Sequence, residues 1–195
     1  MHISSLPGAY GIGSMGKQAY EFVDFLCRAG QAYWQILPLS PTGYGDSPYQ
    51  STSTFAGNPY LIDLETLQSE GLLLPGEAEE FYWGSAPGRV DYGSLYNSRF
   101  ALLRKAFGRF VPDQAYRDFV ADNSDWLEDY SLFMVLKGQF GGEPWQNWPQ
   151  PLRDRVPEAL DEYRNALDGE IRFQYFLQYQ FFRQWQALRS YANER

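Results

Sequence analysis

Two tyrosines and one acidic residue share a Gly- and Pro-rich loop that follows Leu39, namely Tyr44, Tyr49 and Asp46. A tyrosine ring offers an apolar face on which a sugar can stack and a hydroxyl that can form a hydrogen bond. A carboxylate beside such rings can accept hydrogen bonds from sugar hydroxyls. The residue types in this loop therefore predict a carbohydrate-binding segment.

The remaining loop carboxylates, Asp63, Asp91 and Glu143, do not pair with Asp46 or with one another at a spacing that indicates a shared site. Retaining glycosyl transfer needs two carboxyl groups about 5–5.5 Å apart, one as nucleophile and one as acid/base. We therefore assign no catalytic residue within this chain. With one histidine, His2, and no Cys or carboxylate cluster, we predict no transition-metal site.

The individual roles of these residues have more than one interpretation. Asp46 can be a turn aspartate that bonds nearby backbone N–H groups, or an acceptor for glucose hydroxyls, and both can hold. Tyr49 follows Pro48, which stiffens the backbone, so we favour a binding platform over core packing. For His2, a substrate contact and a structural role stand equally.

The elements that must position this loop begin with a helix over Gly16–Ala29, which has an apolar face and ends at Gly30. The apolar run Trp34–Leu39 predicts a buried strand, because nothing in it alternates with charge. A helix that enters a strand through a short Gly turn is half of a βαβ unit, and long loops after parallel strands often carry function. Cys27, the only cysteine, is expected to fill core space within the helix.

The rest of the chain reads as helical. We expect helices over Asn97–Phe110, over Pro112–Gly138 as one or two helices with Ser124 or Asp125 as a cap, and from Pro157 to the C-terminus as one helix or a pair. A barrel helix should return the chain to a parallel strand, and no strand pattern follows the last helix.

The composition of the chain argues against nucleic-acid and membrane partners. The chain has 24 acidic and 16 basic residues, a formal net charge of −8, which argues against a nucleic-acid partner. No run approaches the ~18 apolar residues of a membrane span, so we expect no membrane partner. A single cysteine and no secretion signal fit a cytoplasmic location. Aromatic residues make up 18% of the chain, and we expect some of them to line a binding surface.

The first third of the chain carries a long ordered series of motifs, namely His2-Ile3-Ser4-Ser5-Leu6-Pro7-Gly8, Tyr10-Gly11-Ile12-Gly13, Tyr33-Trp34-Gln35, Leu37-Pro38-Leu39, Pro41-Thr42-Gly43-Tyr44-Gly45-Asp46-Ser47-Pro48-Tyr49-Gln50-Ser51 and Ala56-Gly57-Asn58-Pro59-Tyr60-Leu61-Ile62-Asp63. Two later segments match more weakly, Val90-Asp91-Tyr92-Gly93 and Trp145-Gln146-Asn147-Trp148-Pro149. In their order and spacing these motifs resemble the N-terminal signature of the amylomaltases, or 4-alpha-glucanotransferases, of glycoside hydrolase family 77.

The resemblance implies an α/β fold, part of a (β/α)8 TIM barrel with a long helical insertion after the second strand. The barrel in this chain would be incomplete and mostly helical, an N-terminal fragment whose first strand is reduced to Met1 and whose next strand would begin beyond Arg195. Residues 2–63 would form the barrel start and the glucan-binding loop. Residues 64–156 would form an insertion subdomain, and residues 157–195 the helix that leads to the absent strand.

The same resemblance implies transfer of α-1,4-glucan segments between maltodextrins through a covalent glycosyl-enzyme intermediate, with no cofactor. Tyr49 would stack on the sugar beside the scissile bond, and Asp46, Ser47 and His2 would bind substrate. Tyr44 and Tyr96 would belong to a secondary glucan site, although simple packing explains Tyr96 equally well. The catalytic carboxylates of the family lie on later strands. The alternative is a non-catalytic α-glucan-binding module or an inert fragment.

Overall fold

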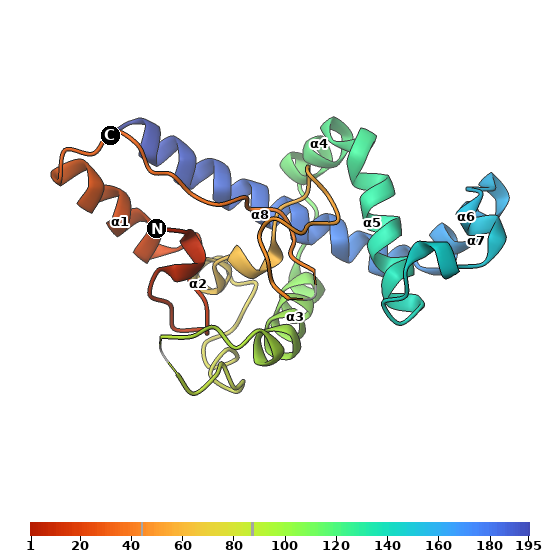
Figure 1. Cartoon of the computed structure of the whole chain (residues 1–195), viewed down its shortest axis with the longest axis horizontal. Helices are drawn as coiled ribbons and strands as arrows, with labels where there is room; N and C mark the ends of the chain where they lie inside the picture. Colours follow the sequence, from red (N-terminus) through yellow and green to blue (C-terminus); the bar gives the residue numbers. More distant parts are fainter. Residues whose placement is uncertain (44, 87) are drawn as a thin grey trace. The chain divides into compact units, whose positions relative to one another are not determined.

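The structure, a computed structural model, describes residues 1–43, 45–86 and 88–195. Over these ranges the chain is mostly helical, and its strand-like pairing is one isolated antiparallel bridge between Thr42 and Ser51 (Figure 1). No helix in the described ranges is both long and apolar enough to cross a bilayer. The elements in chain order are η1 (Ile3–Ser5), α1 (Lys17–Arg28), η2 (Pro59–Leu61), α2 (Leu64–Ser69), α3 (Tyr92–Arg109), α4 (Gln114–Asp122), α5 (Ser124–Gln139), η3 (Trp145–Asn147), α6 (Gln150–Arg153), α7 (Pro157–Ala166) and α8 (Asp168–Asn193).

The helices expected from periodicity are confirmed at α1, α4, α5, α7 and α8. Helix α3 begins earlier than expected, because the Asp91 carboxylate accepts hydrogen bonds from the Ser94 backbone N–H at 3.0 Å and the Ser94 hydroxyl at 2.9 Å. The predicted cap of α5 is wrong. Asn123 occupies that position, and its amide donates to the Phe119 carbonyl of the preceding helix instead.

The prediction of a buried strand over residues 34–39 is wrong for the described chain. The segment is extended, Leu37 is 39% exposed, and no ladder of backbone bonds runs along it in the described ranges. One hydrogen bond holds each end of the segment. The Trp34 indole donates to the Met1 carbonyl at 2.7 Å, and the Asn58 backbone N–H donates to the Leu39 carbonyl at 2.8 Å. An apolar run becomes a strand only when a neighbouring strand supplies hydrogen-bond partners.

The burial predicted for Cys27 is also wrong. Helix α1 buries Ala19 and Val23, whereas Cys27 stands in its last turn and is exposed. There α1 lies beside the end of α8 (Figure 1). The Tyr191 hydroxyl donates to Asp24 at 2.8 Å, the rings of Tyr20 and Tyr191 lie 4.8 Å apart, and the exposed Cys27 thiol donates to the Arg195 carbonyl at 3.7 Å. The contacts at this end of α1 are therefore polar and aromatic, and Cys27 contributes one of them without being buried.

The chain divides into two compact units. One contains Met1–Val111 and Gln180–Arg195, and the other contains Pro112–Tyr179, so that α8 contributes residues to both. The second unit has its own apolar core, in which Trp148 is buried with its ring 5.5 Å from those of Phe133 and Phe140. The other buried members of this core are Leu132, Val135, Leu136, Leu152, Leu160 and Ile171.

In the first unit, the polar centre is the carboxylate of Asp63, which is only 4% exposed. It caps α2 by accepting from the Thr66 backbone N–H and hydroxyl, both at 2.7 Å, and it accepts from the Ser14 hydroxyl at 2.8 Å. The Gln184 amide of α8 pairs with the Asp63 backbone, accepting from its N–H at 2.7 Å and donating to its carbonyl at 3.3 Å. One residue thereby joins three distant parts of the chain.

Two neighbours complete this centre. Gly16 passes so close that an added Cβ would lie 2.1 Å from a carboxylate oxygen of Asp63, so only glycine fits there. The buried guanidinium of Arg99 donates to the Ile62 carbonyl, and burial lowers the pKa of Arg99 to about 10. The Asp63 carboxylate opposes that shift by favouring the charged form.

We predict that Asp63→Ala lowers the free energy of unfolding by about 2–3 kcal/mol, because the α2 cap is lost and buried donors lose their acceptor. Urea unfolding followed by circular dichroism measures this change. Asp91→Ala is the matched control, since it removes a cap in the same unit at an exposed site and should cost less. Equal losses from both variants would contradict the central role of Asp63.

Candidate functional site

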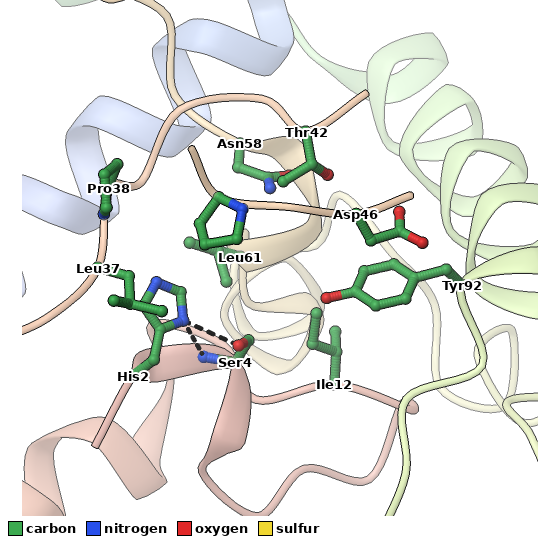
Figure 2. Close-up of a pocket in the computed structure, with 11 residues that line it drawn as sticks. His2, Ser4, Ile12, Leu37, Pro38, Thr42, Asp46, Asn58, Leu61 and Tyr92 are labelled. Carbon is green, nitrogen blue, oxygen red and sulfur yellow. Dashed lines mark hydrogen bonds between the residues drawn. The ribbon is translucent and has the colours of Figure 1, made fainter. Parts of the chain in front are cut away.

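A cavity of about 90 Å³ opens in the first unit, where the N-terminal segment, the loop after Leu39 and the start of α3 meet. Figure 2 shows these side chains gathered around it from three separate parts of the chain. Apolar side chains form much of its wall. The polar side chains that line it are His2, Ser4, Thr42, Asp46, Asn58 and Tyr92.

His2 precedes η1, and its two ring nitrogens differ in their hydrogen bonding. Its Nδ1 lies 3.2 Å from the Ser4 backbone nitrogen, which donates to it, and 2.8 Å from the Ser4 hydroxyl. Nε2 is buried without a hydrogen-bond partner among the described residues. Burial lowers the pKa of His2, against the opposing effect of the Pro38 and Leu37 carbonyls. The ring is therefore neutral at neutral pH, and because Nδ1 accepts, Nε2 carries the proton, with the Leu37 and Pro38 carbonyls nearby but no hydrogen bond among the described residues.

Asp46 adopts a left-handed backbone conformation, with φ at 56°, directly after Gly45 at 95°. Its backbone N–H donates to the Gly43 carbonyl at 3.1 Å, but its carboxylate makes no hydrogen bond to any residue of the described ranges. The interpretation of Asp46 as a turn aspartate requires backbone N–H groups that donate to its carboxylate, and the described ranges contain none. Burial raises the pKa of Asp46, since no donor stabilises its charge.

The other predicted site residues lie elsewhere. The Ser47 hydroxyl accepts from the Tyr49 backbone N–H at 3.4 Å, and the Tyr49 ring is 75% exposed outside the cavity. Tyr96 is exposed on α3, with its ring 5.6 Å from that of Phe100. Tyr44 lies outside the described residues. The cavity therefore unites His2 and Asp46 but not Ser47, Tyr49 or Tyr96.

The other loop carboxylates serve the fold. Asp63 and Asp91 cap helices, as described above, and Glu143 accepts from the Asn147 side-chain amide at 2.9 Å. Each of these groups already has donors, whereas Asp46 has none in the described chain. Asp46 is consequently the carboxylate best placed to receive an external donor.

Sequence reasoning missed Thr42, Tyr60 and Tyr92. The Thr42 hydroxyl is buried without a partner in the described chain and lines the cavity. The rings of Tyr60 and Tyr92 lie 5.9 Å apart, and burial together with the charge of Asp46 raises the pKa of Tyr60 to about 12. Both tyrosines belong to motifs noted in the sequence: Tyr92 to Val90–Gly93 and Tyr60 to the motif that ends at Asp63. Their positions along the chain did not predict that either would lie near Asp46.

Comparison with known proteins finds relatives along the whole chain. Residues 1–195 match the family described as 4-alpha-glucanotransferase, glycoside hydrolase family 77. The 4-alpha-glucanotransferase of Clostridium butyricum is 48% identical over 197 residues, which cover 100% of this chain and 40% of that protein. That of Thermus thermophilus is 50% identical over 198 residues, which cover 98% of this chain and 39% of that protein. The chain thus spans about two fifths of these relatives.

Solved structures give the same result. The amylomaltase from Streptococcus agalactiae in complex with acarbose matches with a TM-score of 0.95 and 41% identity, over 100% of this chain and 40% of that one. The amylomaltase from Corynebacterium glutamicum matches with a TM-score of 0.73 over 99% of this chain and 28% of that one. At 17% identity, the second match speaks for the fold alone.

We predict that Asp46→Asn changes the free energy of unfolding by less than about 0.5 kcal/mol, because the carboxylate has no partner to lose and asparagine tolerates the left-handed region. Asp63→Asn provides the contrast, since an amide cannot accept all the hydrogen bonds that the Asp63 carboxylate receives. Chemical unfolding of both variants tests this. A large loss of stability from Asp46→Asn would show that Asp46 serves the fold.

Proposed function

The chain belongs to the 4-alpha-glucanotransferase family, glycoside hydrolase family 77, and we propose that the complete gene product transfers α-1,4-glucan segments between maltodextrins with retention of configuration. Support comes from the family match over all 195 residues and from the related amylomaltase described in complex with acarbose. The proposed partners are maltooligosaccharides and fragments of starch or glycogen. We also propose a cytoplasmic location, which a chain with a single cysteine fits.

We further propose that residues 2–63 begin a (β/α)8 barrel, that residues 64–156 form an insertion, and that residues 157–195 lead to the next strand. The extended residues 34–39 support this proposal, because their backbone lacks a ladder in the described ranges and a neighbouring parallel strand would supply one. The extended segment leads into the loop that carries Asp46 and Tyr49. TIM-barrel enzymes place their sites on the loops at one end of the barrel.

Within this proposal, the chain binds and orients the glucan, while the catalytic carboxylates lie outside its 195 residues. The observation that carries it is the state of Asp46, which, unlike Asp63, Asp91 and Glu143, has no donor among the described residues and is held beside a cavity in a left-handed turn. Asp46 would accept from a sugar hydroxyl, and the neutral His2 would donate from Nε2 into the same cavity.

The exposed aromatic residues complete the proposed binding surface. Tyr49 offers an exposed, amphipathic ring next to Pro48, and the Ser47 hydroxyl braces the Tyr49 backbone at 3.4 Å. The face of the Tyr49 ring would stack on the sugar beside the scissile bond. Tyr96, exposed on α3, and Tyr44 would belong to the secondary glucan surface that the family resemblance implies.

A second candidate function is a non-catalytic α-glucan-binding module. The engagement of Asp63, Asp91 and Glu143 in folding contacts favours it, because, of the four loop carboxylates, it leaves Asp46 alone available to a ligand, whereas retaining transfer needs two carboxyl groups. The two candidates agree on binding and differ in whether a glycosidic bond is broken.

We expect the complete gene product to convert maltotriose into glucose and longer maltodextrins, and the 195-residue chain alone to form neither, with chromatography separating the products. Products from the short chain would show that catalytic carboxylates lie within it. Binding of maltotriose by the complete gene product without any transfer would favour the binding module. The absence of both binding and transfer would reject both functions.

We predict that Tyr49→Ala in the complete gene product lowers the transfer rate about 100-fold, because losing the stacking platform misplaces the sugar by about 1 Å. Initial rates on maltotriose measure the effect. Tyr82→Ala, which truncates another exposed tyrosine of the same unit outside the cavity, is the matched control and should retain its rate. Normal transfer by Tyr49→Ala would show that the platform assignment is wrong.

A further inference from the structure

Tyr92 is the lining residue to which neither the loop motif nor the functional proposal gives a role. It comes from the first turn of α3, far along the chain from Asp46, yet both side chains line the same cavity. Figure 2 shows the Tyr92 hydroxyl directed in among the lining residues, and the Asp46 carboxylate near the other end of the Tyr92 side chain. No hydrogen bond from this hydroxyl is found within residues 1–43, 45–86 and 88–195.

The position of Tyr92 is fixed by its surroundings. Asp91 caps α3 through two hydrogen bonds to Ser94, which sets the first turn where Tyr92 stands. Its ring lies 5.9 Å from that of Tyr60, and the Tyr60 ring lies 5.8 Å from that of Phe100. Edge-to-face contacts of this kind restrict a ring without using its hydroxyl. The hydroxyl is therefore held in place while it has no hydrogen-bond partner in the part of the chain that the structure describes.

The polar groups around the cavity complement one another. Burial raises the pKa of Tyr92, and the Asp46 charge raises it further, so the phenol stays protonated and can donate. The Asp46 carboxylate can only accept, and the buried Thr42 hydroxyl, which also lacks a partner in the described chain, can do either. Buried polar atoms normally have partners, and two atoms of the lining, His2 Nε2 and Thr42 Oγ1, are buried without one in the described chain. Together with the half-buried Tyr92 hydroxyl and Asp46 carboxylate, they indicate a ligand with several hydroxyls.

We propose that Tyr92 is a substrate-binding residue that determines specificity, its hydroxyl donating to one oxygen of a glucosyl unit while another hydroxyl of the bound glucan donates to Asp46. This inference rests on the proposed function. It adds to that function a contact from α3, outside the loop that carries Asp46 and Tyr49. A sugar fits the pair because it carries several hydroxyls, each of which can both accept and donate.

The test compares unchanged protein with Tyr92→Phe, both as the complete gene product, on maltotriose and on a set of its monodeoxy derivatives. Tyr92→Phe removes one oxygen and keeps the ring, so we expect its thermal unfolding to be unchanged. We expect kcat/KM on maltotriose to fall about tenfold, mainly because KM rises. For one deoxy derivative, the loss seen with the unchanged protein should disappear in Tyr92→Phe. Tyr20→Phe, a half-buried tyrosine outside the cavity, is the control and should behave as the unchanged protein.

The outcomes separate the two proposals. If the unchanged protein transfers glucan and Tyr92→Phe keeps the same kcat/KM, the proposed function stands and the role of Tyr92 is refuted. If kcat/KM falls but every deoxy derivative keeps its ratio to maltotriose, Tyr92 supports the structure only, which also overturns the inference. If the unchanged protein does not transfer glucan, the proposed function fails, and with it the substrate role of Tyr92.

Discussion

A buried carboxylate must find donors for its oxygens or lose the charge, and this requirement at Asp63 organises the first unit. Its donors come from the segment before α1 and from the first turn of α2, while Gln184 of α8 holds its backbone. These parts are far apart in sequence and are brought into one arrangement by a single residue. Because Asn58 and Leu61 immediately precede this centre and line the cavity, the same constraint also positions one wall of the candidate site.

The carboxylates of the loops divide into two groups by what already binds them. Asp63, Asp91 and Glu143 receive donors from their own fold, so their charges are compensated before any ligand arrives. Asp46 differs because its backbone is held in an unusual conformation while its carboxylate has no donor in the described chain. Non-glycine residues held in the left-handed region cluster at functional sites. This contrast separates Asp46 from the carboxylates that serve the fold, a distinction that its neighbours in the sequence did not provide.

The candidate site is built from three parts of the chain, each prepared separately. His2 is oriented by Ser4, Asp46 by the turn at Gly45, and Tyr92 by the cap of α3 and the ring of Tyr60. Each side chain thus keeps a polar atom without a partner in the described ranges while the rest of the residue is fixed. Such preorganisation lowers the entropy lost when a flexible, polar ligand binds. The chain spans about two fifths of the length of its Clostridium butyricum and Thermus thermophilus relatives, so the proposed binding role concerns that part alone.

The sequence by itself determined the helices α1, α4, α5, α7 and α8 and the family, because periodicity, glycine stops and contiguous motifs are local. It was wrong about a strand over residues 34–39 and a buried Cys27, since a strand needs a partner and burial needs a neighbour. Only the tertiary structure brought His2 and Tyr92 to Asp46 and showed which carboxylates the fold uses. Contacts between distant residues depend on how separate elements pack, and no spacing along the chain records that.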